Sequence, residues 1–250
     1  MRVSRVHVNA PLVSGAPAVL AGDAANHIAR VLRLRPGDPL TLFDGRGGEY
    51  EARLSEVQGA KVIVQVGEHR DVERESALEI TLLQGVARGD RMDTIVQKAT
   101  ELGVARIVPV LAERSVVKLD SHTSHRKHAH WLGIAIAACE QCGRNRVPEV
   151  AQPQSVADAT SRECAPDDRC LMLVPGAPVT LAEGAGVASG QRPNAVTLLI
   201  GPEGGLAPAE TELATRAGFV GCRIGPRILR TETASLAAIA ALQAIAGDFV

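Results

Sequence analysis

Aromatic residues, long hydrophobic runs and net charge are all scarce in this sequence. Aromatic side chains make up 2% of its 250 residues, and the formal net charge is −1 at pH 7. Proteins that grip single-stranded nucleic acid by base stacking need several such rings, so the composition argues against a stacking platform. The near-neutral charge argues against a uniformly basic nucleic-acid binder, although local clusters of arginine can still attract an anionic partner.

Segments that would enter or cross a membrane are also lacking. No apolar run approaches the roughly 20 residues that span a bilayer, and the basic start of the chain, residues 1–5, is not followed by the apolar core of a signal peptide. The five cysteines, an odd number without a repeated spacing, do not make a disulfide framework. We therefore expect a soluble cytoplasmic protein with reduced thiols and no membrane partner.

Nucleotide-binding and metal-binding signatures are missing or incomplete. Neither the Gly-x-Gly-x-x-Gly pattern nor the Gly-x4-Gly-Lys-Ser/Thr loop occurs, so the usual phosphate cradles are lacking. Cys139 and Cys142 have a Cys-x-x-Cys spacing and follow several histidines in residues 122–130, which raises a zinc site as one interpretation. No second such pair exists, and Cys139 falls on an apolar helix face, so we expect buried thiols and no metal.

The first 70 residues are predicted to form a small β-rich domain. Alternating segments bounded by tight turns predict strands over residues 2–8, 40–43, 49–57 and 61–66, with a short helix over residues 24–32. Several short strands with tight turns favour a compact barrel. Residues 67–76 are polar, mixed in charge and without periodicity, so we predict a linker there and divide the chain after residue 70.

From residue 78 onward strands and helices alternate, which predicts a mostly parallel sheet covered on both faces. The expected strands are residues 79–84, 106–111, 171–174, 196–200 and 220–224. The expected helices are residues 90–102, 131–142 and 232–246, the second preceded by a polar, histidine-rich stretch over residues 121–130. Residues 176–194, rich in Gly, Ala, Pro and Ser, predict a loop with at most a short helix.

The last predicted helix is apolar on almost every side. Leu236, Ile239, Leu242 and Ile245 lie among alanines. A helix without a polar face is buried all round, which in a chain of this size suggests a subunit interface as well as a core. We therefore expect a homodimer.

Two glycine-proline loops near the C-terminus are the strongest candidates for a binding site. The strand over residues 196–200 runs into Gly201-Pro-Glu-Gly-Gly205, and the strand over residues 220–224 runs into Gly225-Pro-Arg227. Glycine lets the backbone approach a ligand closely, which suits a small polar cofactor shared by both loops. Glu203 puts a negative charge in the first loop, which favours an uncharged or cationic ligand over a polyphosphate. A tight turn without function is the alternative interpretation.

These loops carry a family resemblance. Ile200-Gly-Pro-Glu-Gly-Gly205 with Arg227-Ile-Leu-Arg-Thr-Glu-Thr-Ala234 resembles the cofactor-binding signature of the SPOUT, or trefoil-knot, RNA methyltransferases. Further segments resemble the branch that methylates N3 of a uridine in 16S rRNA, the RsmE family: residues 97–103, 113–118 and 140–144, with His27, residues 30–33 and residues 43–47 upstream. One departure is Ala207, where such sequences often have Ser or Thr, and which removes an N-cap hydrogen bond worth about 1 kcal/mol.

The resemblance implies an α/β fold with two domains. Residues 1–70 would form an N-terminal PUA-like RNA-binding β-barrel, and residues 71–250 a C-terminal SPOUT α/β trefoil-knot methyltransferase domain that is dimeric and uses S-adenosyl-L-methionine. The implied reaction is methylation of N3 of a specific uridine in 16S rRNA of the small ribosomal subunit. The alternatives are a non-catalytic RNA-binding or ribosome-assembly protein with a knotted fold, and a same-fold methyltransferase acting on another RNA.

The knot that the resemblance implies would bring the two glycine-proline loops together around the cofactor. The predicted cofactor contacts are Leu173, Ile200, Gly201, Pro202, Gly204, Gly205, Ile224, Gly225, Ile228, Leu229, Thr231, Thr233 and Ala234. Arg230 is the predicted stabiliser of the developing uracil anion, and Glu232 or Glu203 is expected to accept a proton or to orient a group. A first-turn carboxylate favoured by the helix dipole is an equal interpretation of Glu232.

Arginines supply the predicted RNA contacts, which are to phosphate rather than to base edges. They are Arg2, Arg5, Arg30 and Arg33 in the barrel, and Arg88, Arg91 and Arg144 around the cleft. The expected partner is 16S rRNA, free or in the assembled small subunit, whose folded shape would supply the selectivity.

Overall fold

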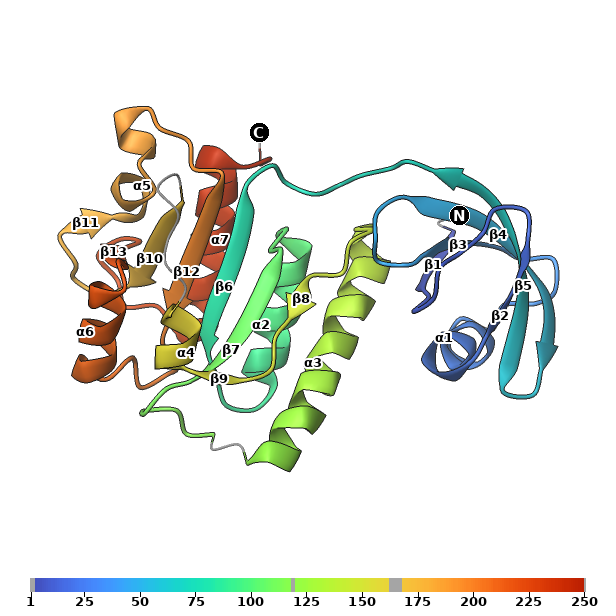
Figure 1. Ribbon diagram of the computed structural model, residues 1–250, viewed down its shortest axis with the longest axis horizontal. Helices are drawn as coiled ribbons and strands as arrows, with labels where there is room; N and C mark the ends of the chain where they lie inside the picture. Colours follow the sequence, from blue (N-terminus) through green and yellow to red (C-terminus); the bar gives the residue numbers. More distant parts are fainter. Residues whose placement is uncertain (1–2, 118–119, 162–167, 250) are drawn as a thin grey trace. The chain divides into compact units, whose positions relative to one another are not determined.

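The computed structural model describes residues 3–117, 120–161 and 168–249, and the chain divides into two compact units (Figure 1). The first contains Met1–Glu75 together with Ile136–Val147, and the second contains Ser76–Ala135 together with Pro148–Val250. Residues 136–147 thus belong with the N-terminal unit, although they are far from it in sequence and no pattern in the sequence indicates this.

A five-stranded sheet in the order β1-β3-β4-β5-β2 forms the N-terminal unit. Its strands are β1 (Ser4–His7), β2 (Pro17–Leu20), β3 (Pro39–Phe43), β4 (Glu49–Gln58) and β5 (Lys61–Arg70). β1 runs parallel to β3, and the other pairs are antiparallel. Successive side chains of a strand point to opposite faces of the sheet. Leu42, Leu54 and Val64 therefore point to the same face, where they pack in one buried core.

Two features of this sheet differ from the prediction. The strand β2 is not predicted, because Gly15 and Pro17 are typical of a loop. This strand lies at the edge of the sheet, where proline is tolerated. β5 continues to Arg70, because β4 offers Glu49 as its partner there. The first four residues of the predicted linker are therefore strand.

The helix predicted over residues 24–32 is split into two turns of different kinds. α1 (Gly22–Asn26) is followed by the π-helical turn η1 (His27–Val31), and Arg33 just beyond it has a φ of 53°. Within the described ranges no other non-glycine residue has a positive φ. Such backbone is unfavourable and is found mostly where a side chain must be presented at a particular place. Here the strained residue is Arg33, whose side chain is exposed, as is that of the nearby Arg30.

The C-terminal unit contains an eight-stranded sheet in the order β11-β13-β10-β12-β6-β7-β8, with β9 also paired to β7, and each of these pairs is parallel. The strands are β6 (Glu79–Gly85), β7 (Arg106–Leu111), β8 (Glu149–Val150), β9 (Gln154–Ser155), β10 (Arg169–Leu173), β11 (Val179–Thr180), β12 (Ala195–Ile200) and β13 (Val220–Arg223). The helical segments are α2 (Asp90–Glu101), α3 (Ser121–Cys142), α4 (Val156–Thr160), α5 (Leu181–Gly184), η2 (Val187–Ser189), α6 (Pro208–Arg216) and α7 (Thr231–Ala246).

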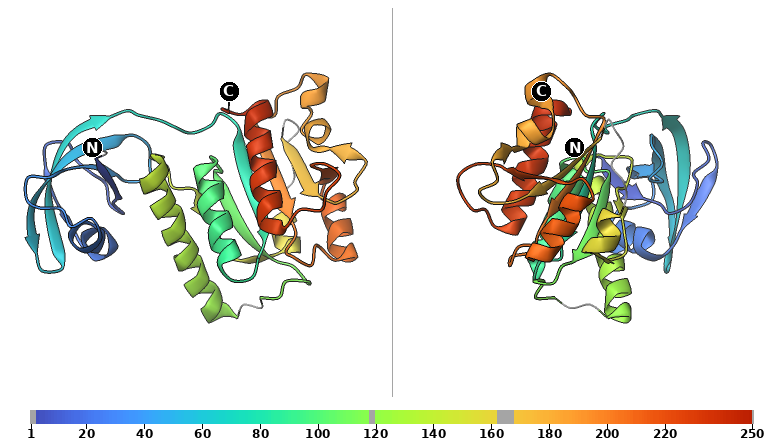
Figure 2. Two further views of the ribbon diagram at one scale, coloured as in Figure 1. Left: turned by 180° about the vertical axis from the view of Figure 1, so that it is seen from behind. Right: turned by 60° about the vertical axis from the view of Figure 1, so that its left-hand side comes forward.

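Helices cover both faces of this sheet. α2 and α7 pack side by side on one face, and α4 and α6 pack together on the other (Figure 2). Leu83 and Leu199 lie in the core beneath α4 and α6, while their strand neighbours Leu82 and Leu198 are equally buried on the opposite side. Strands buried on both faces are nearly continuously apolar, which is why the central strands are predicted correctly.

The chain returns to the end of β12 before its last helix. After the first glycine loop and α6, β13 pairs with β10 rather than with β12. The segment over residues 224–230 then leads back to Gly201, where Thr231 begins α7 with its Oγ1 2.7 Å from Gly201 O. The two glycine-proline loops therefore meet, as the resemblance implies.

Two segments of the C-terminal unit differ from the prediction. The histidine-rich residues 121–130 are helical and form the first part of α3, which begins at Ser121. Their polar side chains have partners on neighbouring segments: His130 Nε2 lies 2.8 Å from Asp93 Oδ2. Residues 176–194 hold β11, α5 and η2 rather than one short helix, and Thr180 caps α5 through a capping box that composition alone does not indicate.

The departure at Ala207 has the expected local form. Ala207 is the N-cap of α6, makes no side-chain capping bond, and is followed by proline at the first helical position. Its N–H donates to Glu210 Oε2 at 2.8 Å, so half of a capping box survives.

A buried polar cluster ties the end of α3 to the N-terminal sheet. Arg5 Nη1 lies 2.5 Å from Glu49 Oε2, and Arg5 Nη2 donates to Asn145 Oδ1 at 2.5 Å. Arg144 forms an ion pair with Glu75. Buried charges persist only when they are paired, so these contacts bind residues 136–147 into the N-terminal unit.

In the described part of the chain, no helix is long and apolar enough to span a bilayer. Cys139, Cys142 and Cys222 are free, whereas Cys170 is disulfide-bonded. The expectation of reduced thiols is therefore wrong for Cys170, since an odd number of cysteines rules out complete pairing but not a single bridge.

Candidate functional site

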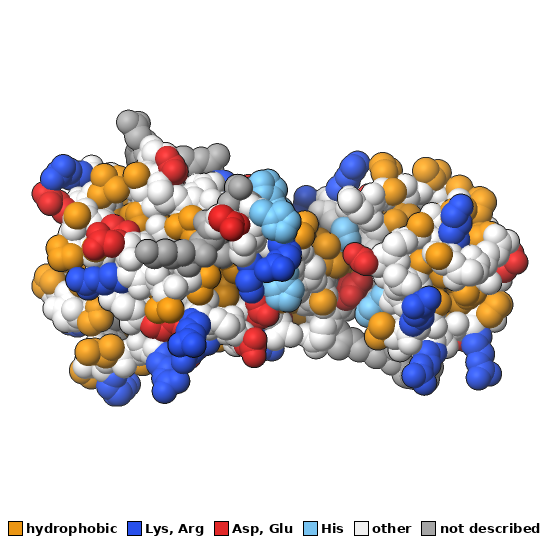
Figure 3. All heavy atoms as spheres, turned by 90° about the horizontal axis from the view of Figure 1, so that it is seen from below, with side chains coloured by type: hydrophobic (Ala, Val, Ile, Leu, Met, Phe, Trp, Pro, Cys, Tyr) orange, Lys and Arg blue, Asp and Glu red, His pale blue; other side chains and the backbone are white. Residues whose placement is uncertain are grey.

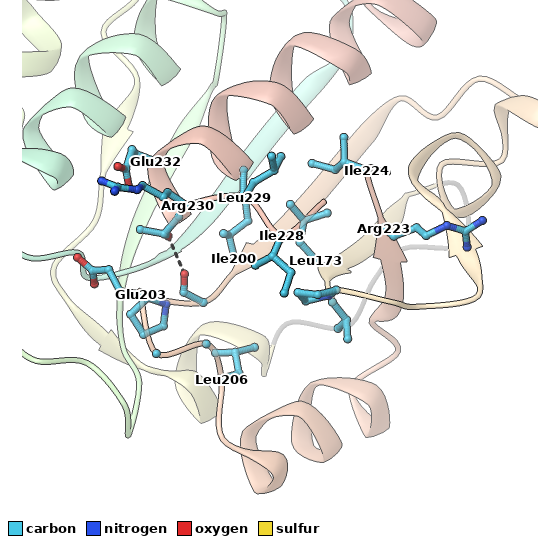
Figure 4. Close-up of a pocket in the computed structure, with 18 of the residues that line it drawn as sticks. Leu173, Ile200, Glu203, Leu206, Arg223, Ile224, Ile228, Leu229, Arg230 and Glu232 are labelled. Carbon is cyan, nitrogen blue, oxygen red and sulfur yellow. Dashed lines mark hydrogen bonds between the residues drawn. The ribbon is translucent and has the colours of Figure 1, made fainter. Parts of the chain in front are cut away.

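The two glycine-proline loops wall one cavity of about 620 Å³. The first loop follows β12, and the second follows β13 and leads into α7. In Figure 4 the side chains of Arg230, Glu232 and Glu203 lie at one end, and those of Leu173 and Ile224 lie toward the other. A pocket with a charged end and an apolar wall suits a ligand that is part ring system and part charged group.

Twelve of the thirteen predicted cofactor contacts line this cavity: Leu173, Ile200, Gly201, Pro202, Gly204, Gly205, Ile224, Gly225, Ile228, Leu229, Thr231 and Ala234. Thr233 does not line it and is exposed on α7, because each helical residue is turned by about 100° from the one before. The wall also holds residues that were not predicted as contacts: Val174, Pro175, Leu206, Thr211, Cys222, Arg223 and Arg227. Several of these adjoin a predicted residue, so proximity in sequence is the signal that could have found them.

Close backbone approach explains the glycines around the first loop. A Cβ on Gly85 would lie 2.4 Å from Pro202 N, and one on Gly201 would lie 2.9 Å from Leu206 N. Real Cβ atoms do not approach backbone so closely, so the end of β6 can meet the first loop only with glycine at position 85, and the first loop can fold back on itself only with glycine at position 201. Gly85 does not line the cavity, but it lets β6 pack against the first loop, and no pattern in the sequence indicates this.

Glu203 is anchored at the charged end. Its Oε1 accepts a hydrogen bond from Arg88 N at 3.0 Å and one from Arg91 Nη1 at 2.7 Å. Partial burial raises the pKa of the Glu203 carboxyl, but the Arg88 N–H and the Arg91 guanidinium outweigh it and leave the pKa below its ordinary value. A carboxylate with a lowered pKa is a weak base, and two hydrogen bonds to one of its oxygens make it a good anchor.

Glu232 differs from Glu203. Its Oε1 lies 3.7 Å from Arg91 Nε, whereas its Oε2 is buried and has no hydrogen-bond partner among the described residues. A buried carboxylate oxygen without a partner is costly unless a ligand supplies the donor. Glu232 also stands in the first turn of α7, where the helix dipole favours negative charge, which fits its interpretation as a first-turn carboxylate.

Arg230 is the N-cap residue of α7 and lines the cavity. Its backbone is extended, with φ −65° and ψ 153°, and its side chain is exposed. Arg91 is neutralised by two carboxylates, whereas no such ion pair within the described ranges involves Arg230. Arg230 therefore brings an exposed positive charge to the charged end of the cavity, where Glu232 also lies.

Four of the predicted RNA contacts are accessible. Arg91 lines the cavity, Arg88 is exposed nearby in sequence, and Arg30 and Arg33 are exposed on the N-terminal unit. On the face in Figure 3, the Lys and Arg side chains of each unit stand apart rather than forming one continuous field, in keeping with a net charge of −1.

Arg5 and Arg144 do not suit the predicted RNA contacts. Their side chains are 9% and 5% exposed and are paired with Glu49 and Glu75. A phosphate could reach them only by breaking a buried ion pair, which costs about 3–5 kcal/mol. Arg144 also belongs to the unit that does not contain the cavity. Arg2 lies outside the described residues.

The Cys-x-x-Cys pair lies on α3 and is not arranged for metal. Burial raises the pKa of the Cys139 thiol to about 12, and its Sγ lies 3.5 Å from Arg146 O. A metal ligand must be a thiolate, so a thiol held protonated is a poor one. Within the described ranges, no three His, Cys, Asp or Glu side chains are grouped closely enough to hold a metal ion.

Comparison with known families matches both units. Residues 74–243 match the model of the RNA methyltransferase domain, and residues 20–67 match that of the RNA methyltransferase PUA domain. With the parallel sheet and its meeting loops, these matches define an α/β methyltransferase of the SPOUT, trefoil-knot class with an N-terminal PUA-like unit. The predicted fold class is thereby confirmed.

Individual relatives identify the family within this class of methyltransferases. The chain is 36% identical over 226 residues to the ribosomal RNA small subunit methyltransferase E of Bacillus subtilis, covering 89% of this chain and 88% of the relative. It is 32% identical over 247 residues to the protein of that name from Buchnera aphidicola subsp. Schizaphis graminum, covering 99% and 98%. The chain belongs to the ribosomal RNA small subunit methyltransferase E family.

Solved structures agree with this assignment. A putative methyltransferase from Legionella pneumophila, in complex with the bound cofactor SAM, has a TM-score of 0.91 and 37% identity, with 100% of both chains covered. The ribosomal RNA small subunit methyltransferase E of Neisseria gonorrhoeae, bound to S-adenosyl methionine, has a TM-score of 0.89 and 36% identity, also over 100% of both chains.

Proposed function

We propose that this protein transfers a methyl group from S-adenosyl-L-methionine to N3 of a specific uridine in 16S rRNA of the small ribosomal subunit. The observation that carries the proposal is the cavity between residues 201–205 and 225–232, which joins an apolar wall to a charged end. Family membership supports the substrate class, and two similar structures with that cofactor bound support the cofactor.

The residues around the cavity suit S-adenosylmethionine. Leu173, Ile200 and Leu229 would contact the adenine ring, and backbone groups of the glycine loops would meet its polar edge and the ribose. The carboxylates of Glu203 and Glu232 disfavour a phosphate and suit a cationic ligand. When bound, S-adenosylmethionine supplies a methyl carbon on a sulfonium that a nucleophile can attack.

Making uracil N3 nucleophilic requires removal of its proton. Arg230, accessible at the start of α7, would stabilise the negative charge that develops on the uracil oxygens. Glu232 Oε2, buried and without a partner among the described residues, would accept the N3–H hydrogen bond and take or orient the proton. Of the two carboxylates that the sequence leaves open, Glu232 is the better candidate, because Glu203 Oε1 already accepts hydrogen bonds from Arg88 and Arg91, which lower the pKa of its carboxyl.

RNA binding would use both units. We propose that residues 1–70 form an RNA-binding domain. Its exposed arginines, Arg30 and Arg33, would contact phosphate. Arg88 would do so beside the cavity, where its side chain is exposed. A ribosomal substrate also implies a cytoplasmic location.

We further propose a homodimer that uses α7. Within the single chain α7 buries one face, which includes Ile239 and Leu242, while Leu236 and Ile245 are only partly covered. Ile228, just before the helix, is 83% exposed. Apolar side chains left uncovered next to a binding site are typical of an interface, and light scattering of the full chain tests this.

Two measurements on the purified protein test the proposed reaction. Calorimetric titration should show binding of S-adenosylmethionine, and labelled methyl should pass to 16S rRNA in small subunits that lack the modification. The label should be recovered as N3-methyluridine. Absence of cofactor binding would support a non-catalytic RNA-binding protein instead, and label in a tRNA or on a ribose would support another methyltransferase of the same fold.

A further inference from the structure

A chain of hydrogen bonds buried beside the cavity joins both glycine loops to β6. Gln84, which is 0% exposed, donates from Nε2 to Gly85 O at 3.0 Å and to Thr231 Oγ1 at 3.0 Å. Thr231 Oγ1 in turn donates to Gly201 O at 2.7 Å. Ser235 Oγ, one turn further along α7, donates to Gln84 Oε1 at 2.5 Å.

The polar hydrogens of Gln84 and Thr231 have defined directions in these hydrogen bonds. Gly85 O can only accept, so the amide nitrogen of Gln84 must face it and the amide oxygen must face Ser235. The second amide hydrogen goes to Thr231 Oγ1. The hydroxyl hydrogen of Thr231 is then left for Gly201 O, which also only accepts. Because a buried polar group without a partner is costly, loss of one member disturbs the whole chain.

These hydrogen bonds lie where the backbone of β6 touches the first loop. A Cβ on Gly85 would lie 2.7 Å from Gly201 C, so these two segments are in direct contact. Thr231 begins α7 and follows directly on the second loop. The Thr231–Gly201 hydrogen bond therefore connects the first loop to the end of the second, and Gln84 fixes the hydroxyl that makes it.

We infer that Gln84 and Thr231 are positioning residues that set the separation of the two cofactor-binding loops. Thr231 was predicted as a direct contact, but its hydroxyl is committed to Gly201 and acts on the ligand through that loop. The inference rests on the proposed function for the identity of the ligand. It assigns a role in binding to Gln84, which does not line the cavity.

Thr100 provides a matched control for a merely structural role. It is also 0% exposed, and its Oγ1 donates to Val96 O at 2.8 Å within α2. Thr100 does not line the cavity. Replacing Thr100 by valine removes a buried hydroxyl, as Thr231→Val does, so Thr100→Val should also melt earlier than wild type.

The test titrates S-adenosylmethionine into the full-length protein by calorimetry, below the melting temperature of every variant. Thr231→Val should bind about tenfold more weakly than wild type, the effect of one or two lost hydrogen bonds. Thr231→Ser, which keeps the hydroxyl, should bind nearly as well as wild type. Thr100→Val should melt earlier and bind with unchanged affinity.

Gln84→Met tests the other end of the chain, because it keeps the shape and removes the amide. Its affinity should fall as in Thr231→Val, and the double variant should bind no more weakly than Thr231→Val alone, since both changes break one chain. Wild-type affinity in Thr231→Val, or equal weakening in Thr100→Val, would overturn the inference. If the wild type itself binds no S-adenosylmethionine, the proposed function fails; if it binds and Thr231→Val binds equally, only the positioning role fails.

Discussion

Arg91 Nη1 lies 2.7 Å from Glu203 Oε1 at the charged end of the cavity. The same oxygen accepts the N–H of Arg88, so the turn before α2 is fastened to the first glycine loop. Glu232, 3.7 Å from Arg91 Nε, keeps an oxygen without a partner among the described residues. The pair thus makes Glu203 an anchor and leaves Glu232 as the carboxylate for which we propose a role toward the substrate.

Glu232→Gln should lower the rate of methyl transfer about a hundredfold, the usual contribution of a positioned proton acceptor. Glu203→Gln should lower it much less, because Oε1 of that carboxylate is already hydrogen-bonded to Arg88 and Arg91. Single-turnover kinetics with saturating cofactor measure both rates. Equal losses in the two variants, or the larger loss in Glu203→Gln, would contradict the separation of roles.

Arg230→Ala should lower the transfer rate about a hundredfold while leaving S-adenosylmethionine affinity nearly unchanged, because the charge acts on the developing uracil anion. Arg216→Ala is the matched control, since Arg216 is an exposed arginine on α6 paired with Glu212. Turnover and calorimetric affinity are measured on the same preparations. Near-normal turnover in Arg230→Ala would remove this residue from the mechanism.

Gly85→Ala should abolish cofactor binding and lower the melting temperature, because its Cβ would lie 2.4 Å from Pro202 N. Gly133→Ala on α3 is the control: nothing lies within 4 Å of its Cβ, and alanine in a helix is favoured by about 1 kcal/mol. Thermal melts should therefore shift in opposite directions. A Gly85→Ala protein that binds S-adenosylmethionine normally would show that the close approach of β6 and the first loop is unimportant.

The double variant Arg30→Ala and Arg33→Ala should weaken RNA binding and reduce its dependence on salt, with little loss of stability, because both side chains are exposed. Arg144→Ala should instead destabilise the protein, since it removes the buried guanidinium and leaves the partly buried Glu75 without this partner. Binding to 16S rRNA at several salt concentrations and thermal melts distinguish the two. An unchanged salt slope in the double variant would rule out these phosphate contacts.

Acid should weaken the N-terminal unit through Glu49. Burial raises the pKa of its carboxyl, but hydrogen bonds and charge from Arg5, with help from Asn145 and Arg74, outweigh burial and lower the pKa below the ordinary 4.5. The stability from this group is therefore present above pH 4.5 and is lost as pH falls through the lowered pKa. Glu49→Gln should be less stable than wild type at pH 7, and the difference in the free energy of unfolding should shrink at low pH. Urea unfolding at a series of pH values measures this difference, and a difference that stays constant with pH would contradict the role of Glu49.

Local patterns predicted most of the fold. The central strands β6, β7 and β12 are mostly apolar and buried, so they are predicted nearly to the residue. Partners that lie far away in sequence were not predictable. β2 forms because β5 is beside it, and α3 begins at Ser121 because its histidines meet Asp93 and Val150 O.

The same limit applies to the site. Glycine, proline and charge in two short segments indicated the cavity wall, because those residues are adjacent in sequence. Gln84 and Gly85 were missed, since their importance depends on Thr231 and Gly201, more than a hundred residues away. Arg5 and Arg144 were chosen for their charge, and only their buried partners show that this charge is already used.

The most direct test of the central claim is mass mapping of 16S rRNA from a strain in which the gene is deleted, compared with the same strain after the gene is restored. One uridine should lack a single methyl group at N3 in the deletion strain and should regain it when the gene is restored. The gene carrying Arg230→Ala should not restore this methyl group. An unchanged mass for every uridine of 16S rRNA, with a methyl group missing from another RNA or from none, would contradict the proposed reaction.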